Sequence, residues 1–189
     1  MATESFNPQL CMKRPCLDGL PEIMLPPGYT IRTFREGDGP HWARIIRESF
    51  ANSSFDESSF ERIMMTHQSY RPDRIFFSCG PDGLPCGTAS AYRADSYGAG
   101  VGYIHYVGVC PMHNGKGLGA LVSLAVLHQF RAEGLQSAVL QTDDFRLPAI
   151  KTYLKLGFLP LIVHENQPAR WTDVFEKLGV PAPSEYGAS

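Results

Sequence analysis

The stretch YIHYVGVCPMHNGKGLGALVSLAVLHQF, residues 103–130, decides the fold. An alternating apolar run stops at Pro111, a glycine-dense loop follows, and a long apolar helical pattern begins at about residue 117. Gly134 suits the end of that helix, because glycine readily adopts the left-handed conformation found just past a helix C-terminus. The stretch therefore predicts a strand, a loop and a helix in direct succession.

The loop between this strand and this helix has the chemistry of an anion site. It reads His113-Asn114-Gly115-Lys116-Gly117-Leu118-Gly119-Ala120. The first amides of a helix lack intrahelical partners, the helix dipole adds partial positive charge, and glycines let a ligand approach the backbone closely. Phosphate fits such a site best, and Lys116 adds a mobile positive charge. The alternative is a glycine turn that only joins the strand to the helix.

Neither common nucleotide-binding motif fits this loop. The Walker pattern requires Gly-Lys followed by Ser or Thr, whereas Lys116 is followed by Gly117. The dinucleotide fingerprint requires G-x-G-x-x-G, whereas the spacing here is G-x-G-x-G. A protein that binds ATP or NAD through this loop is therefore the less favoured hypothesis.

The remaining pattern predicts an α/β (α+β) domain. Strands are expected at residues 29–36, 74–79, 84–93, 101–109, 137–142 and 158–165, and helices at 37–50, 56–67, 117–132 and 147–157. Antiparallel hairpins followed by a β-α-β unit predict a mixed, mostly antiparallel sheet with helices on both faces. Residues 1–27 are expected to form an N-terminal arm packed on a domain that spans residues 28–189. Residues 168–179 are amphipathic, and the pattern leaves their structure open.

Composition excludes several functional classes. The 189 residues are 43% hydrophobic and carry a formal net charge of -2 with no dense basic block, so no nucleic-acid surface is expected. No apolar run approaches the roughly 18–20 residues that span a bilayer and no signal core opens the chain, so a cytoplasmic protein without a membrane segment is expected. The five cysteines match no zinc or redox spacing, so no metal site is expected. Cys110 is expected to be a small buried residue, with a nucleophilic thiol as the alternative.

Two blocks carry a family resemblance. GVCPMHNGKGLGALV (108–122) resembles the coenzyme A loop of the GNAT superfamily of N-acetyltransferases, in which Arg or Gln is followed at fixed spacing by Gly and then by Gly or Ala. Gly117 and Gly119 match, whereas Asn114 stands where Arg or Gln is usual. PAIKTYLKLGF (148–158) resembles a later helix of the family, with Arg146 in place of a common Asn. The N-terminal block at 14–38 looks like the start of members related to mycothiol synthase.

The resemblance implies a GNAT-like sheet splayed at its centre and acetyl-CoA as co-substrate. The acetyl group would pass by direct attack to a primary amine of a small molecule or peptide. The implied coenzyme-binding residues are Val107, Val109, Asn114, Gly115, Lys116, Gly117, Leu118, Gly119, Ala120, Arg146, Ala149 and Tyr153. A surface arginine is the alternative for Arg146, and a catalytically silent coenzyme A-binding or sensory module is the alternative for the protein. The acceptor amine and the oligomeric state stay open, a homodimer included.

Two residues are candidates for the proton transfers. The resemblance makes Tyr153 the donor to the leaving thiolate, because a phenol stays protonated at neutral pH. His105 is the candidate base, since residues 103, 105, 107 and 109 of a regular strand share one face. A buried tyrosine and a histidine packed in a strand are the respective alternatives.

Overall fold

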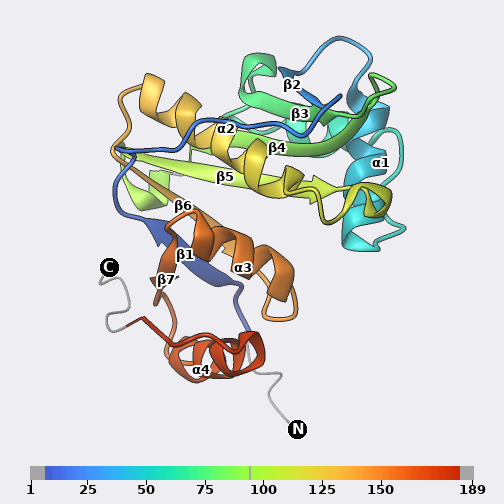
Figure 1. Ribbon diagram of the computed structural model, residues 1–189. Coiled ribbons are helices and arrows are strands. Elements are labelled where there is room, and N and C mark those ends of the chain that lie inside the picture. The colour runs from blue at the N-terminus through green and yellow to red at the C-terminus, as the bar shows by residue number, and fades with distance from the viewer. Residues whose placement is uncertain (1–6, 94, 184–189) are drawn as a thin grey trace, which may run out of the picture. The chain divides into compact units, whose positions relative to one another are not determined.

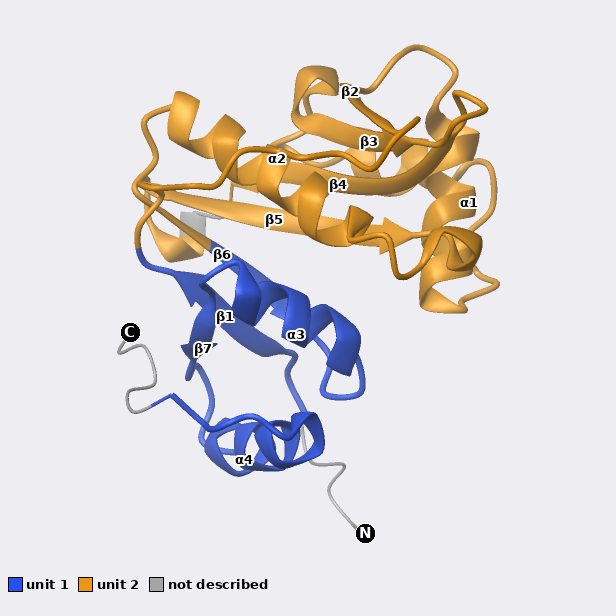
Figure 2. Ribbon diagram, in the orientation of Figure 1, with its two compact units in different colours: residues 1–15, 139–189 blue, residues 16–138 orange. Residues whose placement is uncertain are grey.

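The structure, a computed structural model, describes residues 7–93 and 95–183. The chain divides into two compact units (Figures 1 and 2). The larger unit is Cys16–Ala138, and the smaller combines the described parts of Met1–Pro15 and Val139–Ser189. The N-terminal segment expected to be an arm therefore contributes to both units.

The larger unit is built on four antiparallel strands. In sheet order these are β2 (Thr30–Thr33), β3 (Ile75–Cys79), β4 (Pro85–Arg93) and β5 (Val101–Val109). The first eight residues of β4, an internal strand, are buried. A strand buried on both faces requires helices on both sides of the sheet. The strands predicted from alternation are confirmed here, and the bounds of β5 match the prediction.

Two glycines show that the two helices of this unit cover opposite faces. A Cβ added at Gly102 would lie 2.4 Å from the Phe130 ring of α2 (Leu118–Ala132). A Cβ added at Gly108 would lie 2.4 Å from Ser49 Oγ and 3.2 Å from Ile46 of α1 (Gly39–Phe50). Each helix therefore contacts the bare backbone of β5, and the predicted helices on both faces are confirmed for this unit.

The region after α1 differs from the predicted second α-helix. A π-helical turn covers Phe60–Met65, and just before it the Asp56 carboxylate accepts from the Ser58 N–H while the Ser59 hydroxyl accepts from the Asp56 N–H. Short polar side chains that bind their own backbone neighbourhood compete with helix formation, which shortens the helical segment. Phe60 packs edge-to-face on Trp42 of α1 and is buried in the core of this unit.

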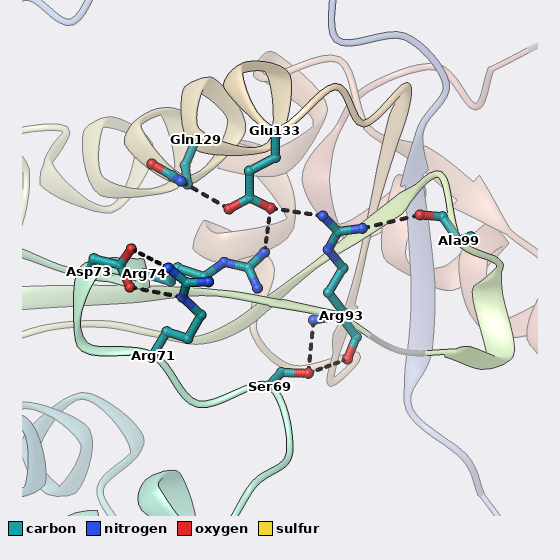
Figure 3. Close-up of polar contacts among 8 residues, drawn as sticks. All are labelled: Ser69, Arg71, Asp73, Arg74, Arg93, Ala99, Gln129 and Glu133. Atoms are coloured by element: carbon teal, nitrogen blue, oxygen red, sulfur yellow. Dashed lines mark hydrogen bonds and ion pairs between the residues drawn. The ribbon is translucent and has the colours of Figure 1, made fainter.

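An ion-pair network fixes the C-terminal end of α2 (Figure 3). Glu133 Oε2 accepts hydrogen bonds from Arg74 at 2.8 Å and from Arg93 at 3.0 Å, while Gln129 donates to Oε1. The Arg74 side chain is only 7% exposed, so Glu133 supplies its counter-charge in a partly desolvated place. This network ties α2 to the end of β4 and to the loop before β3.

The smaller unit contains strands in the order β6-β1-β7. Its elements are β1 (Leu10–Arg14), the last four residues of β6 (Ser137–Thr142), α3 (Leu147–Lys155), β7 (Leu159–Leu161) and α4 (Gln167–Leu178). Strands β1 and β7 are antiparallel, with Cys11 opposite Leu161. Part of the N-terminal segment is therefore a sheet strand. The amphipathic segment that the sequence left open forms α4, with Trp171 fully buried.

The helices are short relative to a bilayer. The 15 residues of α2 extend about 22 Å at about 1.5 Å per residue. Within residues 7–93 and 95–183, no helix combines the length and the apolar character needed to cross a membrane.

Candidate functional site

The glycine loop presents a run of backbone amides without protein partners. Its entry is fixed by a 3-10 turn at Pro111–His113, where the Asn114 N–H donates to the Pro111 carbonyl at 3.1 Å. The next amide with a partner is that of Leu121, which donates to the Gly117 carbonyl. Between them, in the described chain, the amides of residues 115–120 donate to no protein acceptor. The orphan donors expected at a helix start are therefore present, and they begin at Gly115.

The glycines of this loop have different surroundings. Gly115 and Gly117 have φ angles of 79° and 73°, a region that strains other residues. A Cβ added at either would meet no atom within 4 Å, whereas one at Gly119 would lie 3.7 Å from Val109 Cγ2. The loop is thus open to solvent at residues 115–117 and turned toward the sheet at Gly119. Lys116 is exposed beside the open amides and adds positive charge there.

Cys110, just before the loop, does not have the properties of a nucleophile. Its side chain is 2% exposed, and the Arg44 guanidinium donates to its Sγ at 3.2 Å. Burial first, and then Glu48, raises the pKa of Cys110 to about 12, so the thiol keeps its proton at neutral pH. The expectation of a small buried residue is confirmed.

A β-bulge in β5 changes which side chains share a face. Ser90 of β4 lies opposite His105 and Thr88 lies opposite Gly108, so two steps on β4 face three on β5. Within the bulge, Tyr106 has a φ of 48°, which is rare for a bulky residue. The prediction that residues 103, 105, 107 and 109 share one face is therefore wrong.

Contacts between aromatic rings show on which face of the sheet the bulge places His105. His105 lies against Tyr92, Tyr103 and Tyr106, with ring centroids 4.3–5.2 Å apart, and Tyr106 packs on Trp42 of α1. These rings are on the α1 side of the sheet. Val109, in contrast, lies beside the start of α2, and alternation puts Val107 on that same side. The loop and the histidine are therefore on opposite faces of β5.

His105 is a neutral side chain in this setting. Burial first, and then the neighbouring His67, lowers its pKa from 6.5 to about 4. The imidazole therefore carries no charge at neutral pH and has a nitrogen lone pair available. Its low pKa also makes it a weak base, so it would relay a proton rather than hold it.

The second block of site residues lies in the smaller unit, on α3 and the loop before it. Tyr153 is 6% exposed and packs edge-to-face on Phe158 at 6.1 Å, while Ala149 is half-buried in the first turn. Arg146 Nε donates to Asp143 at 2.8 Å, and its guanidinium lies 5.4 Å from the ring of Phe145. Phe145 is 76% exposed, and no pattern in the sequence singles it out. The described residues contain no cluster of three or more side chains suited to hold a metal.

Comparison with known proteins gives consistent results. The family model for the Acetyltransferase (GNAT) family matches residues 40–158. A mycothiol acetyltransferase of Thermomonospora curvata is 32% identical over 154 residues, which cover 79% of this chain and 50% of that protein. The chain thus spans about half the length of such relatives.

Solved structures share the fold. A GCN5-related N-acetyltransferase from Sphaerobacter thermophilus has a TM-score of 0.63 and 24% identity, covering 82% of this chain and 49% of that one. A GNAT family acetyltransferase from Brucella melitensis, in complex with acetyl-CoA, has a TM-score of 0.50 and 18% identity, covering 61% of this chain and 76% of that one. These likenesses confirm the α/β fold class. Because the family model matches more than half of its residues, this chain belongs to the GNAT family of acetyltransferases.

Proposed function

We propose that this protein transfers an acetyl group from acetyl-CoA to a primary amine of a small molecule or peptide. The observation that carries the proposal is the run of unpartnered amides at residues 115–120, at the start of α2, with residues 115–117 exposed to solvent. Such a helix start binds a diphosphate without any further cation. Family membership supports the acetyl donor, and the Brucella melitensis relative is itself a complex with acetyl-CoA.

The coenzyme would contact several parts of the chain. The diphosphate would accept hydrogen bonds from the amides of residues 115–120, including those of Leu118 and Ala120, with Lys116 and the Asn114 side chain at its edge. The amides of the pantetheine arm would pair with backbone groups of Val107 and Val109, as an added strand does. The bulge supports this pairing at Val107, because it leaves Val107 outside the regular ladder with β4, whereas Val109 is still opposite Gly87. In the smaller unit, Arg146 would bind a phosphate group and Ala149 would leave room for the arm.

Two proton transfers accompany the attack. The acceptor ammonium loses a proton, its nitrogen then forms a bond to the thioester carbonyl carbon, and the carbon–sulfur bond breaks. We assign the first proton to neutral His105, acting directly or through water, since its pKa leaves a free lone pair at neutral pH. We assign the second to Tyr153, whose phenol would donate to the departing thiolate sulfur. A catalytically silent coenzyme-binding module is the second candidate.

The choice of acceptor is a separate proposal. Relatives that are about 30% identical are named mycothiol acetyltransferases, so the acceptor used by those enzymes belongs in the first panel. Residues 28–189 would form the acetyltransferase domain, with residues 1–27 as an N-terminal arm that contributes strand β1 to its sheet. The five free cysteines suit a cytoplasmic location.

A ligand screen tests the proposed function. Thermal unfolding would be followed with acetyl-CoA, coenzyme A, ATP and NAD, because a ligand that binds only the folded state raises the apparent stability. We expect a shift with the two coenzyme A species alone. A shift with ATP or NAD and none with coenzyme A would reject the proposal. An amine panel monitored by free-thiol release then separates the enzyme from the silent module.

A further inference from the structure

A side-chain pair anchors the entrance of the glycine loop. Tyr29 immediately precedes β2, and His113 ends the 3-10 turn from which the loop departs. The Tyr29 hydroxyl lies 3.0 Å from His113 Nδ1, and the two rings meet edge-to-face with centroids 5.8 Å apart. Both side chains are half-buried. A long-range contact thus holds the first residues of the loop.

The surroundings of Tyr29 keep its phenol protonated. Partial burial first, and then Cys86 and Asp82, raises the pKa of Tyr29, so the phenol keeps its proton at neutral pH. The protonated hydroxyl and His113 Nδ1, 3.0 Å apart, are therefore within hydrogen-bond distance of each other. This contact, with the edge-to-face packing of the two rings, fixes the orientation of the His113 ring.

The turn between β3 and β4 also contacts the His113 ring. A Cβ added at Gly80 would lie 3.3 Å from His113 Cε1 and 2.9 Å from Asp82 Oδ1. A Cβ added at Gly28 would lie 3.2 Å from the Pro81 side chain, so the residues before β2 also contact this turn. Two segments distant in sequence thereby contact the His113 ring. The backbone N–H of His113 donates to the Cys110 carbonyl at 2.9 Å.

We propose that Tyr29 and His113 are positioning residues that set the affinity of the loop for the diphosphate of the coenzyme; this inference rests on the proposed function. Gly115 and Gly117 are exposed and flexible by composition, and ordering one backbone residue costs about 1–2 kcal/mol. An anchor two residues before Gly115 reduces the disorder that ligand binding must remove. Neither side chain takes part in the bond-making step, so their loss weakens binding and leaves the chemical step intact.

The test compares two acetyl donors. Acetyl-CoA carries the diphosphate, whereas acetylpantetheine presents the same thioester without it. The variants are Tyr29→Phe, which removes only the hydroxyl, and His113→Ala. The matched control is His128→Ala. His128 lies in the C-terminal half of α2, and its Nε2 also forms a hydrogen bond to a carbonyl distant in sequence, that of Pro21.

We expect both variants to raise the KM for acetyl-CoA and the Kd for coenzyme A roughly 5- to 10-fold, as the loss of one hydrogen bond does, with kcat unchanged. Their kcat/KM with acetylpantetheine should stay at the wild-type value. The His128→Ala variant should keep the wild-type kcat/KM with both donors. Gly80→Ala, whose Cβ would crowd Asp82 Oδ1 at 2.9 Å and His113 Cε1 at 3.3 Å, should weaken binding in the same direction as His113→Ala. Equal losses with the two donors, or no loss with acetyl-CoA, would overturn the inference. Absence of coenzyme A binding in the wild type would instead overturn the proposed function, and the inference with it.

Discussion

Alanine at Gly117 separates the structural and ligand-binding roles of the loop. Gly117 has a φ of 73°, and a left-handed conformation costs an L-residue about 1–2 kcal/mol. The lower entropy of the unfolded alanine chain offsets about 0.4–1 kcal/mol of this cost. The net loss of about 0.5–1 kcal/mol would lower the Tm by about 1–4 °C for a chain of this size. No protein atom lies within 4 Å of the added Cβ, so steric damage to the fold is not expected.

The effect on binding should be much larger than the effect on stability. The Cβ at Gly117 would project into the open space before the amides, where the diphosphate would lie, and we expect the Kd for coenzyme A to rise at least about 10-fold, or 1.4 kcal/mol. Gly119→Ala is the matched control, because its Cβ faces Val109 at 3.7 Å and alanine in a helix is favoured by about 0.5–1 kcal/mol. It should raise the Tm slightly and bind within threefold of the wild type. Calorimetry that finds wild-type affinity in Gly117→Ala would refute the amide site.

Three further predictions concern single side chains. Because the folded pKa of His105 is about 4, below the ordinary 6.5, its contribution to stability is present above pH 6.5 and is lost as the pH falls toward 4. In urea unfolding, the free energy of unfolding should be lower at pH 4.5 than at pH 7.5, by at most roughly 3 kcal/mol. His105→Gln should reduce this difference. Tyr153→Phe should lower kcat while the Kd for coenzyme A stays unchanged, and unchanged turnover would remove the phenol from the mechanism. Glu133→Gln leaves buried Arg74 without its carboxylate and should cost about 2–3 kcal/mol in urea unfolding, whereas Asp73→Asn, in an exposed pair, should cost under about 1 kcal/mol.

Local patterns predict most of the elements but not those that depend on distant partners. The strand Val101–Val109 and the strand Ser137–Thr142 have the predicted bounds, since alternation or a continuous apolar run is a property of the segment itself. Leu10–Arg14 was not predicted as a strand, because it becomes one only by pairing with Leu159–Leu161 far along the chain. The π-helical turn was expected as an α-helix, since its apolar spacing does not distinguish the two.

The same distinction, between features set by the local sequence and contacts between distant segments, holds for the candidate site. The unpartnered amides of the glycine loop follow from chemistry that the sequence displays, a glycine-rich entry to a helix. The contact between Tyr29 and His113 does not, because it joins residues 84 positions apart and depends on how two strands and a turn pack. Phe145 lies outside both family blocks, and its exposure becomes visible only in the structure.

The bulge in β5 shows how one inserted residue reorganises a proposed mechanism. In a regular strand, His105 and Val109 would be on one face, and a histidine beside the pantetheine arm would follow. The extra residue at the bulge instead turns His105 toward the aromatic rings on the α1 side and Val109 toward the start of α2. The strain at Tyr106, about 1–3 kcal/mol for such a backbone, is maintained because its ring packs against Trp42, Phe50 and Phe55. The proposed diphosphate-binding loop and the proposed base are thereby separated onto opposite faces of one strand, so the acceptor amine would reach the thioester of the bound coenzyme from the side of His105.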